Sequence, residues 1–247
     1  MTSPLFLLPP GSLDDSGPGS VVAVLGAEAH HAAAALRIRV GDEVLVGDGA
    51  GRRAVARVES ADPKRVDVRV ETIVWQPAAD PSFVLVQALA KNDRDEQAVE
   101  AATELGVDAV VPWQAARSVV QWRADRVARG IRSWEALARA ATKQSRGFRV
   151  PLVHPLARTA QVAELLAGAA LGLVLHEEAS TPLTRVELPP TGSVVVVVGP
   201  EGGIAPEELE AFATAGAQQV RLGTQVLRAS SAGPAALAVL NARSRWG

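Results

Sequence analysis

The sequence predicts an α/β protein in which a small β-rich domain precedes a larger domain built on a parallel sheet with helices on both faces. Three observations predict this. Valine-rich segments fill the first 75 residues, a stretch with two prolines and no periodicity follows at 75–82, and apolar runs then alternate with helix-like segments. We therefore expect domains at 1–75 and 80–247, joined by a linker.

The composition is that of a globular protein. Of the 247 residues, 48% are hydrophobic and 21% are charged, which is ample for a buried core. The chain has no cysteine, which excludes disulfides and thiolate metal sites and fits a reducing, cytoplasmic location. The apolar run near the N-terminus is short and lacks a basic start, so we expect neither a signal peptide nor a membrane partner.

The first domain is expected to be a small barrel. Strands are predicted at 43–46, 53–60 and 66–74, and a short helix around 28–36 interrupts them. Val66, Val68 and Val70 alternate with charged residues, which is typical of a strand with one buried face. The sequence GDGAG at 47–51 predicts a tight turn between two of the strands.

The second domain is expected to alternate strands with helices. Strands are predicted at 83–89, 109–113, 171–175, 194–198 and 219–222, and helices at 93–106, 125–144, 206–215 and 231–243. Asp93 is predicted to cap the first of these helices, with Glu96 three residues on. The uninterrupted run Val194–Val198 is typical of a strand buried on both faces.

Positive charge is concentrated in one part of a chain whose net charge is −2. Residues 113–150 contain nine basic residues against two acidic ones, a net charge of +7. On a helical wheel over 125–144, four of the basic side chains fall within one arc: Arg129, Arg132, Arg139 and Lys143. The arc is either an ordinary solvated face or a contact for a phosphate backbone. We favour the contact, because few acids are interspersed and Arg146 follows the helix.

Two glycine-containing loops follow predicted strands. Val198 runs into GPEGGI at 199–204, and the strand ending near Leu222 runs into GTQVLR. Neither loop has the GxxxxGK[ST] or GxGxxG spacing of the common phosphate-binding loops, and Glu201 would repel a phosphate. Each loop alone has the alternative of being a plain turn. Together with Leu175 and His176 at a third strand end, they are predicted to line one pocket for a ligand with hydroxyl, amine or positive groups.

The loops also carry a family resemblance. GPEGGIAPEE followed by LGTQVLRASSA resembles the RsmE family of the SPOUT superfamily, whose members methylate N3 of a uridine in 16S ribosomal RNA. QALAKNDRDEQAVEAATELGVDAVVPWQAARSVV at 87–120, TKQSRGFRVP at 142–151 and HHAAAALRIRVGDEVLVGDGAG at 30–51 are also similar to family segments, in the family's order. The resemblance therefore covers nearly the whole chain.

The resemblance implies a PUA-like RNA-binding barrel, a SPOUT domain with a deep trefoil knot, and a homodimer that acts on 16S rRNA or the small ribosomal subunit. It implies S-adenosylmethionine as the cofactor and no metal, and the four histidines show no metal-ligand spacing. The implied cofactor-binding residues are Leu175, His176, Gly199, Pro200, Glu201, Gly202, Gly203, Ile204, Leu222, Gly223, Val226 and Leu227. From the basic arc and the first domain, the residues expected to bind RNA are Arg37, Arg129, Arg132, Arg139, Lys143 and Arg146.

Catalytic roles are expected for Arg228, which follows the second loop, and for Arg117. Arg228 would contact RNA or stabilise the uracil anion, with an ion pair to Glu201 or Glu177 as the alternative. Glu201 itself would bond to the cofactor or hold its loop in place, and Arg37 would meet RNA or pair with Asp42 or Glu43.

The sequence departs from the family at Ser230, where many members have glutamate, so a role for that glutamate does not carry over. Two other functions stay open: a SPOUT methyltransferase acting on transfer RNA or on a ribose hydroxyl, and an RNA-binding protein without catalytic activity. The uridine that is methylated and the group that accepts its proton are also left open.

Overall fold

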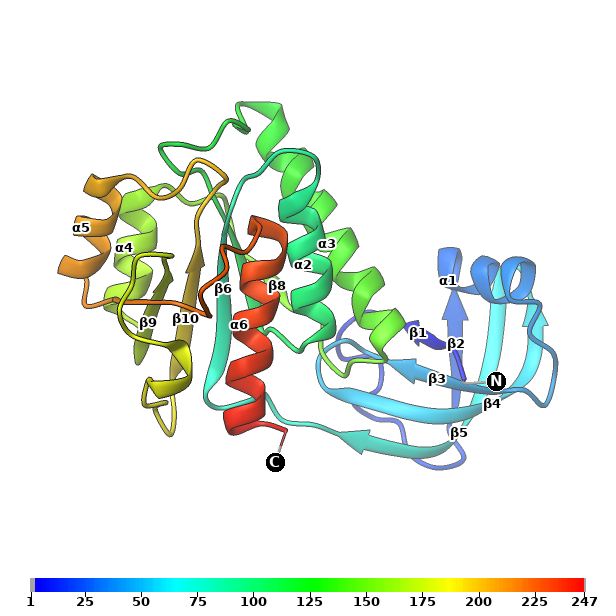
Figure 1. Cartoon of the computed structure of the whole chain (residues 1–247). Coiled ribbons are helices and arrows are strands. Elements are labelled where there is room, and N and C mark those ends of the chain that lie inside the picture. Colours follow the sequence, from blue (N-terminus) through cyan, green and yellow to red (C-terminus); the bar gives the residue numbers. More distant parts are fainter. Residues whose placement is uncertain (1–2, 247) are drawn as a thin grey trace. The chain divides into compact units, whose positions relative to one another are not determined.

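The computed structural model describes residues 3–246 and separates into two compact units, shown along the sequence in Figure 1. The smaller unit contains the residues up to Ala78 together with Thr142–Val150. The larger unit contains Ala79–Ala141 and the residues from Pro151 onward. The segment Thr142–Val150 therefore differs from the sequence-based division, which assigns all of 80–247 to the second domain.

The smaller unit is built on a five-stranded sheet with the order β1-β3-β4-β5-β2. Its strands are β1 (Leu5–Leu7), β2 (Val21–Leu25), β3 (Glu43–Gly47), β4 (Arg52–Asp62) and β5 (Arg65–Trp75). The helix α1 (Gly26–His30) and a π-helical turn (His31–Ala35) follow β2. All pairings are antiparallel except that of β1 with β3.

The predicted alternation in β5 is confirmed. Val66, Val68 and Val70 are buried in the core of the unit, and the residues between them face outward. On the outer face, cross-strand ion pairs join β4 to β5, for example Arg57 to Glu71 at 2.7 Å between Nε and Oε1. The apolar face therefore fixes the register, and the charged face adds modest support.

The segment Thr142–Val150 packs against these strands. The Val150 N–H donates to the Gly49 carbonyl at 2.9 Å, and the Arg53 guanidinium lies 3.8 Å from the centre of the Phe148 ring. These contacts link residues about 100 positions apart in sequence. No local pattern in the sequence predicts such a link, and the sequence-based division therefore places the segment with the second domain.

The larger unit is built on a six-stranded parallel sheet with the order β11-β9-β10-β6-β7-β8, as predicted from the strand and helix alternation. Its strands are β6 (Ser82–Ala88), β7 (Ala109–Trp113), β8 (Leu152–Val153), β9 (Leu171–Leu175), β10 (Ser193–Val198) and β11 (Gln218–Val220). Its helices are α2 (Arg94–Glu104), α3 (Asp125–Ser145), α4 (Thr159–Ala167), α5 (Pro206–Thr214) and α6 (Ala229–Ser244), and α3 ends in the segment that packs with the smaller unit. The strand β8 and the helix α4 were not predicted from the sequence.

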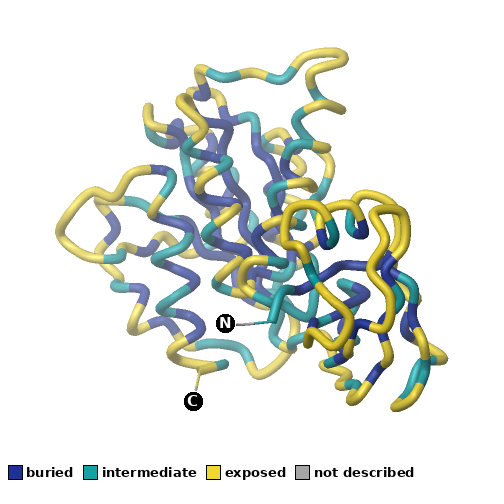
Figure 2. The backbone as a smooth tube through the Cα atoms, turned by 90° about the vertical axis from the view of Figure 1, so that its right-hand side faces the viewer, coloured by how far each residue is buried: buried dark blue, intermediate teal, exposed yellow. Residues whose placement is uncertain are grey.

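Both faces of this sheet are covered, which confirms the interpretation of the valine run. Val194, Val196 and Val198 pack in one core with residues of α2 and α6, whereas Val195 and Val197 pack in another core with residues of α4 and α5. Most residues of β6, β7, β9 and β10 are buried, whereas the edge strands β8 and β11 are partly exposed. Figure 2 colours each residue by its burial. Two of the site loops therefore follow strands, β9 and β10, that are buried almost throughout.

Two details of the predicted elements differ in the structure. Asp93 occupies the N-cap position of α2, but its φ is 55° and its side chain makes no capping hydrogen bond, because the backbone there is left-handed. The last strand ends at Val220 rather than at 222. Arg221 leaves the ladder and bonds through its backbone to Thr181 and Leu183. None of the helices in residues 3–246 has the length and apolarity needed to traverse a lipid bilayer.

Candidate functional site

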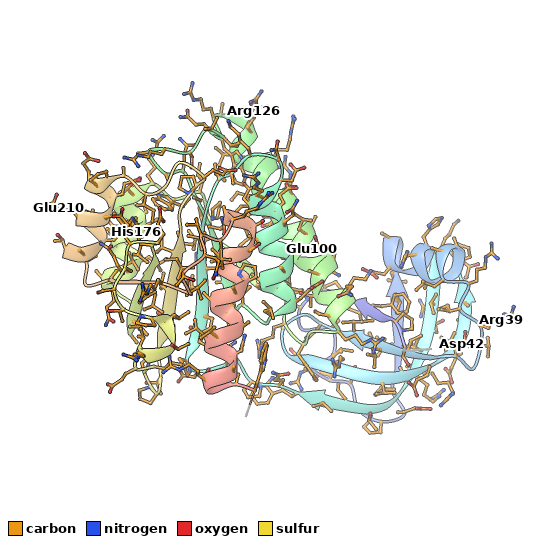
Figure 3. All side chains as sticks on the ribbon, viewed as in Figure 1. Arg39, Asp42, Glu100, Arg126, His176 and Glu210 are labelled. Carbon is orange, nitrogen blue, oxygen red and sulfur yellow. The ribbon has the colours of Figure 1, made fainter. Side chains whose placement is uncertain are left out.

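The candidate site lies at the carboxyl ends of β9, β10 and β11, which are neighbours in the sheet. The loops after these strands line one cavity of about 290 Å³, to which Arg94, the first residue of α2, also contributes. Its lining includes Arg94, Leu175, His176, Glu177, Gly199, Pro200, Glu201, Gly203, Ile204, Val226, Leu227 and Arg228. His176, labelled in Figure 3, comes from the loop after β9. This edge is where open α/β sheets bind their ligands.

A smaller recess of about 80 Å³ shares several of these residues and adds Leu222, Gly223 and Gln225. The structure therefore brings together, around two adjoining cavities, all the residues predicted to bind a cofactor except Gly202. Arg94 was not predicted from the sequence, because it begins a helix that is far from the glycine loops in sequence.

The loop after β10 needs its glycines for two different reasons. A Cβ at Gly199 would lie 2.6 Å from Cγ1 of Ile204, so only glycine allows the loop to fold back on itself. Gly203 has a φ of +74°, and its N–H donates to the Pro200 carbonyl at 2.9 Å, closing a tight turn. The turn exposes the backbone to the cavity.

Glu201 holds this loop in place. Its Oε1 accepts hydrogen bonds from the Lys91 N–H and from Nη1 of Arg94, both at 3.1 Å. The Glu201 and Arg94 side chains are each 27% exposed, so the ion pair is partly shielded from water. Of the two roles expected for Glu201, the structure favours the one that anchors the loop to the start of α2.

Arg117 holds the same loop from another segment. Its guanidinium donates to the Gly202 carbonyl at 3.2 Å, and a Cβ at Gly202 would lie 3.3 Å from the Arg117 Cβ. Gly202 therefore permits a close approach to Arg117. Neither residue lines the cavity. The contact that the structure shows for Arg117 is therefore with the loop after β10 rather than with the cavity.

Glu208 is a buried carboxylate that the sequence analysis missed. It is only 4% exposed, and its Oε1 accepts from the Ala116 N–H at 2.9 Å and from the Thr159 hydroxyl at 2.7 Å. Its Oε2 accepts from the Ala205 N–H at 3.1 Å. One side chain thus ties the start of α5 to the Arg117 segment and to α4. Glu208 lies three residues after Ala205, the N-cap of α5, and a glutamate at this position often accepts the N–H of the N-cap residue. This spacing could have predicted the bond to Ala205 from the sequence.

The loop after β11 offers its backbone to the cavity. Within residues 3–246, the N–H groups of Gly223 to Leu227 have no hydrogen-bond partner in the protein. Backbone donors in folded proteins are nearly always satisfied, so these amides are available to a ligand or to water. The recess beside them is where a ligand would meet them.

Arg228 sits at the N-cap of α6 with its side chain exposed at the cavity wall. In the part of the chain that the structure describes, its guanidinium makes no ion pair; Glu201 pairs with Arg94 instead. The alternative in which Arg228 pairs with Glu201 or Glu177 is therefore not what the structure shows.

The basic arc of α3 is not uniform. Arg129 and Arg132 are exposed, whereas Arg139 and Arg146 are half-buried. Lys143 forms an ion pair with Glu28 of the smaller unit, at 2.7 Å between Nζ and Oε2. The charge of Lys143 is therefore largely neutralised within the protein, against the expectation that it faces RNA.

Arg37 of the smaller unit is exposed, and both acids proposed to pair with it are engaged elsewhere. Asp42 accepts the backbone N–H of Arg39 at 2.7 Å, and Glu43 accepts the hydroxyl of Ser3 at 2.6 Å. Among residues 3–246, no group of three histidine, cysteine, aspartate or glutamate residues is arranged to hold a metal.

Comparison with known proteins agrees with this geometry. A family model described as an RNA methyltransferase domain matches residues 78–241, and one described as an RNA methyltransferase PUA domain matches residues 24–71. The chain is 45% identical to ribosomal RNA small subunit methyltransferase E of Mycobacterium tuberculosis, over 92% of this chain and 89% of that protein. It is 27% identical to the protein of the same name from Bacillus subtilis, over 88% of each chain.

A solved structure is similar throughout. The Neisseria gonorrhoeae ribosomal RNA small subunit methyltransferase E, crystallised with S-adenosyl methionine, matches with a TM-score of 0.84 and 26% identity over 98% of both chains. The fold, the cavity at the strand ends and the relatives lead to one conclusion: this chain belongs to the ribosomal RNA small subunit methyltransferase E family of RNA methyltransferases.

Proposed function

We propose that this protein transfers a methyl group from S-adenosylmethionine to N3 of a uridine in 16S ribosomal RNA. The observation that carries the proposal is the convergence of three strand-end loops on one cavity in a member of an RNA methyltransferase family. The named relatives act on ribosomal RNA of the small subunit. The choice of uridine N3 rests on the sequence resemblance.

The cavity fits the cofactor. In one wall of the cavity, Gly199 and Gly203 leave the backbone uncovered by side chains. The backbone amides of Gly223 to Leu227, which have no partner among the described residues, border the adjoining recess. Such backbone groups suit an adenine ring and a ribose, while Glu177 suits a positive charge. Loops from β9, β10 and β11 are those that the resemblance places in the trefoil knot.

The bound cofactor supplies an electrophilic methyl group on a positively charged sulfur. The chain has to hold the uracil nitrogen in line with that methyl group and to stabilise the negative charge that remains when N3 loses its proton. We assign the second task to Arg228, whose guanidinium is exposed at the cavity and has no partner among the described residues. Arg117, Glu201 and Glu208 act by holding the loops in position.

RNA binding is proposed for the exposed Arg129, Arg132 and Arg37, with Arg139 and Arg146 in support. We further propose a cytoplasmic homodimer. Its support is the exposure of apolar side chains near the site: Val226 is 76% exposed at the cavity, and Val119 is 65% exposed two residues from Arg117. Sedimentation equilibrium of the purified protein tests this, and a monomer at micromolar concentration would contradict it.

The test of the main proposal has two independent measurements. Isothermal titration calorimetry with S-adenosylmethionine should show one site per chain, and mapping of methylated uridines in ribosomal RNA from cells with and without the gene should show one N3-methyluridine lost. Unchanged methylation in the deletion strain would overturn the assigned substrate even with the cofactor bound.

Arg228→Ala is expected to lower kcat by roughly 100-fold, because a charge stabiliser acting in the transition state is removed. Its effect on cofactor affinity should be much smaller. Arg185→Ala is the matched control, because Arg185 is an exposed arginine of the same unit that does not line the cavity. Normal turnover of the Arg228 variant would remove this residue from the chemistry.

A further inference from the structure

A second and larger cavity lies in the same unit, and of the residues that line it only Arg129 has a role in the function proposed so far. Its volume is about 460 Å³. It is formed by the residues at the start of α2, the segment just before α3, and the first turns of α3. Its lining includes Asp93, Asp95, Glu96, Trp122, Arg126 and Arg129.

One wall is a fixed aromatic ring. Trp122 packs so closely on α3 that a Cβ at Gly130 would lie 2.5 Å from its ring, and the ring meets Trp134 edge to face at 5.7 Å between centroids. The Trp122 backbone N–H also donates to Oε1 of Gln114 at 3.1 Å. The indole is therefore held in one orientation while part of it lines the cavity, as a stacking platform requires.

A second wall carries positive charge. Arg126 and Arg129 both lie on the exposed first part of α3, and neither guanidinium makes an ion pair within residues 3–246. Figure 3 labels Arg126 at the exposed start of this helix. Two unpaired guanidinium groups beside an aromatic ring suit a phosphate attached to a base.

The third wall carries hydrogen-bonding carboxyl groups. Asp95 is 5% exposed, and burial raises its pKa to about 6, so that both protonation states are populated around pH 6. Glu96 is held by the Ser133 hydroxyl, which donates to Oε1 at 2.9 Å. A carboxyl group that can both donate and accept complements the alternating donors and acceptors of a nucleobase edge.

The two cavities share one segment of chain. Arg94 faces the cofactor cavity and bonds to Glu201, whereas its neighbours Asp93 and Asp95 line the second cavity. A ligand in the second cavity would therefore lie directly across this segment from the methyl donor. The two ligands that must meet in an RNA methyltransferase are the donor and the RNA strand.

We propose that the second cavity binds a nucleotide of the RNA substrate that flanks the reacting uridine, with its base stacked on Trp122 and its phosphate held by Arg126 and Arg129. The inference rests on the proposed function, because it identifies the occupant as part of the RNA. It adds a contact that selects the sequence or conformation of the strand around the target base.

Titration of the wild-type protein with uridine 5′-monophosphate, followed by tryptophan fluorescence, gives the first test. Saturable quenching is expected, and it should persist when S-adenosylhomocysteine fills the cofactor cavity. Quenching abolished by S-adenosylhomocysteine, or reproduced by inorganic phosphate alone, would overturn the proposal. Saturable binding of S-adenosylhomocysteine in the same samples tests the cofactor site separately.

Variants give the second test, read as the affinity for an RNA fragment that contains the target uridine. Trp122→Ala is expected to weaken binding roughly tenfold, and Trp122→Phe much less, since stacking survives. The Arg126→Ala/Arg129→Ala double variant should weaken binding to a similar extent without depending on the packing of Trp122.

Arg185→Ala removes a charge elsewhere in the unit, outside the cavity and outside the basic arc of α3. It should weaken binding less than Arg129→Ala does. Equal losses for Arg129→Ala and Arg185→Ala would assign the effect to overall charge and overturn the proposal. Methylation by the wild-type protein, measured in parallel, keeps this outcome distinct from failure of the proposed function.

Discussion

Replacing Glu208 by glutamine tests whether one buried carboxylate organises the segments around the cofactor cavity. The carboxylate accepts three hydrogen bonds, from the Ala116 N–H, the Thr159 hydroxyl and the Ala205 N–H. Glutamine can keep the two bonds to Oε1 through its carbonyl oxygen. Its NH₂ group must then face the Ala205 N–H, so that two donors oppose each other.

The expected cost follows from this count. A hydrogen bond to a charged group contributes about 1.5–3 kcal/mol. Glutamine loses one such bond and the charge, so Glu208→Gln should lower the free energy of unfolding by about 2–3 kcal/mol. Alanine loses all three bonds and leaves the donors buried, so Glu208→Ala should cost roughly 5 kcal/mol or more. Glu207→Gln is the matched control, because Glu207 is an exposed neighbour on the same helix turn.

Equilibrium urea unfolding followed by tryptophan fluorescence measures the effect. Trp113 reports on the relevant core, since it is fully buried and meets Phe212 of α5 edge to face at 5.3 Å. Affinity for S-adenosylmethionine should fall together with stability, because the loop after β10 leads directly into α5. If Glu208→Gln and Glu207→Gln unfold at the same urea concentration, the carboxylate does not organise these segments.

Three further predictions follow from the same structure. Asp95→Asn should change the pH dependence of stability. The native carboxyl binds its proton more tightly than the unfolded one, so wild-type stability should fall relative to the variant as pH rises from about 4 to 6. The shift from 3.8 to about 6 corresponds to about 3 kcal/mol, and a difference that is constant with pH in urea unfolding would contradict it. Gly199→Ala should lower S-adenosylmethionine affinity at least tenfold in calorimetry, because the added methyl group would lie 2.6 Å from Cγ1 of Ile204; wild-type affinity would show that the loop adapts. Glu201→Gln should cost no more than about 1 kcal/mol in stability, because its pair with Arg94 is partly exposed, yet it should weaken cofactor binding several-fold. A double-mutant cycle with Arg94 checks this, and additive effects would show that the pair is not coupled.

Elements whose type follows from local pattern were predictable from the sequence. The valine run at 194–198 and the apolar run at 171–175 became β10 and β9, because a strand covered on both faces needs apolar residues throughout. The glycine loops were predictable for a related reason. A loop that begins where a buried strand ends projects from the carboxyl edge of the sheet, and neighbouring parallel strands bring such loops together.

The rest depends on contacts between residues far apart in sequence. From the sequence, Glu208 is an ordinary acid in the first turn of a helix. Its hydrogen bonds to Ala116 and Thr159 come from distant segments and can be identified only in the structure. Lys143 likewise belongs to a basic arc in the sequence, and only the structure shows its ion pair with Glu28. The helix at 159–167 was missed although Val162 and Leu166, four residues apart, form its buried face. Helical wheels and motifs predict which side chains share a face of a helix, but they do not predict which distant residues that face contacts.

The interleaving of the two units affects how the chain is made. The ribosome releases a polypeptide from its N-terminus, so the strands β1 to β5 emerge long before Phe148 and Val150, which complete their packing. The smaller unit therefore stays unfinished until more than half of the 247 residues have been synthesised. A fragment that stops at Ala78 would lack the partner of the Gly49 carbonyl and the ring that packs on Arg53, so an engineered split of this protein should keep residues 142–150 together with the first 78 residues.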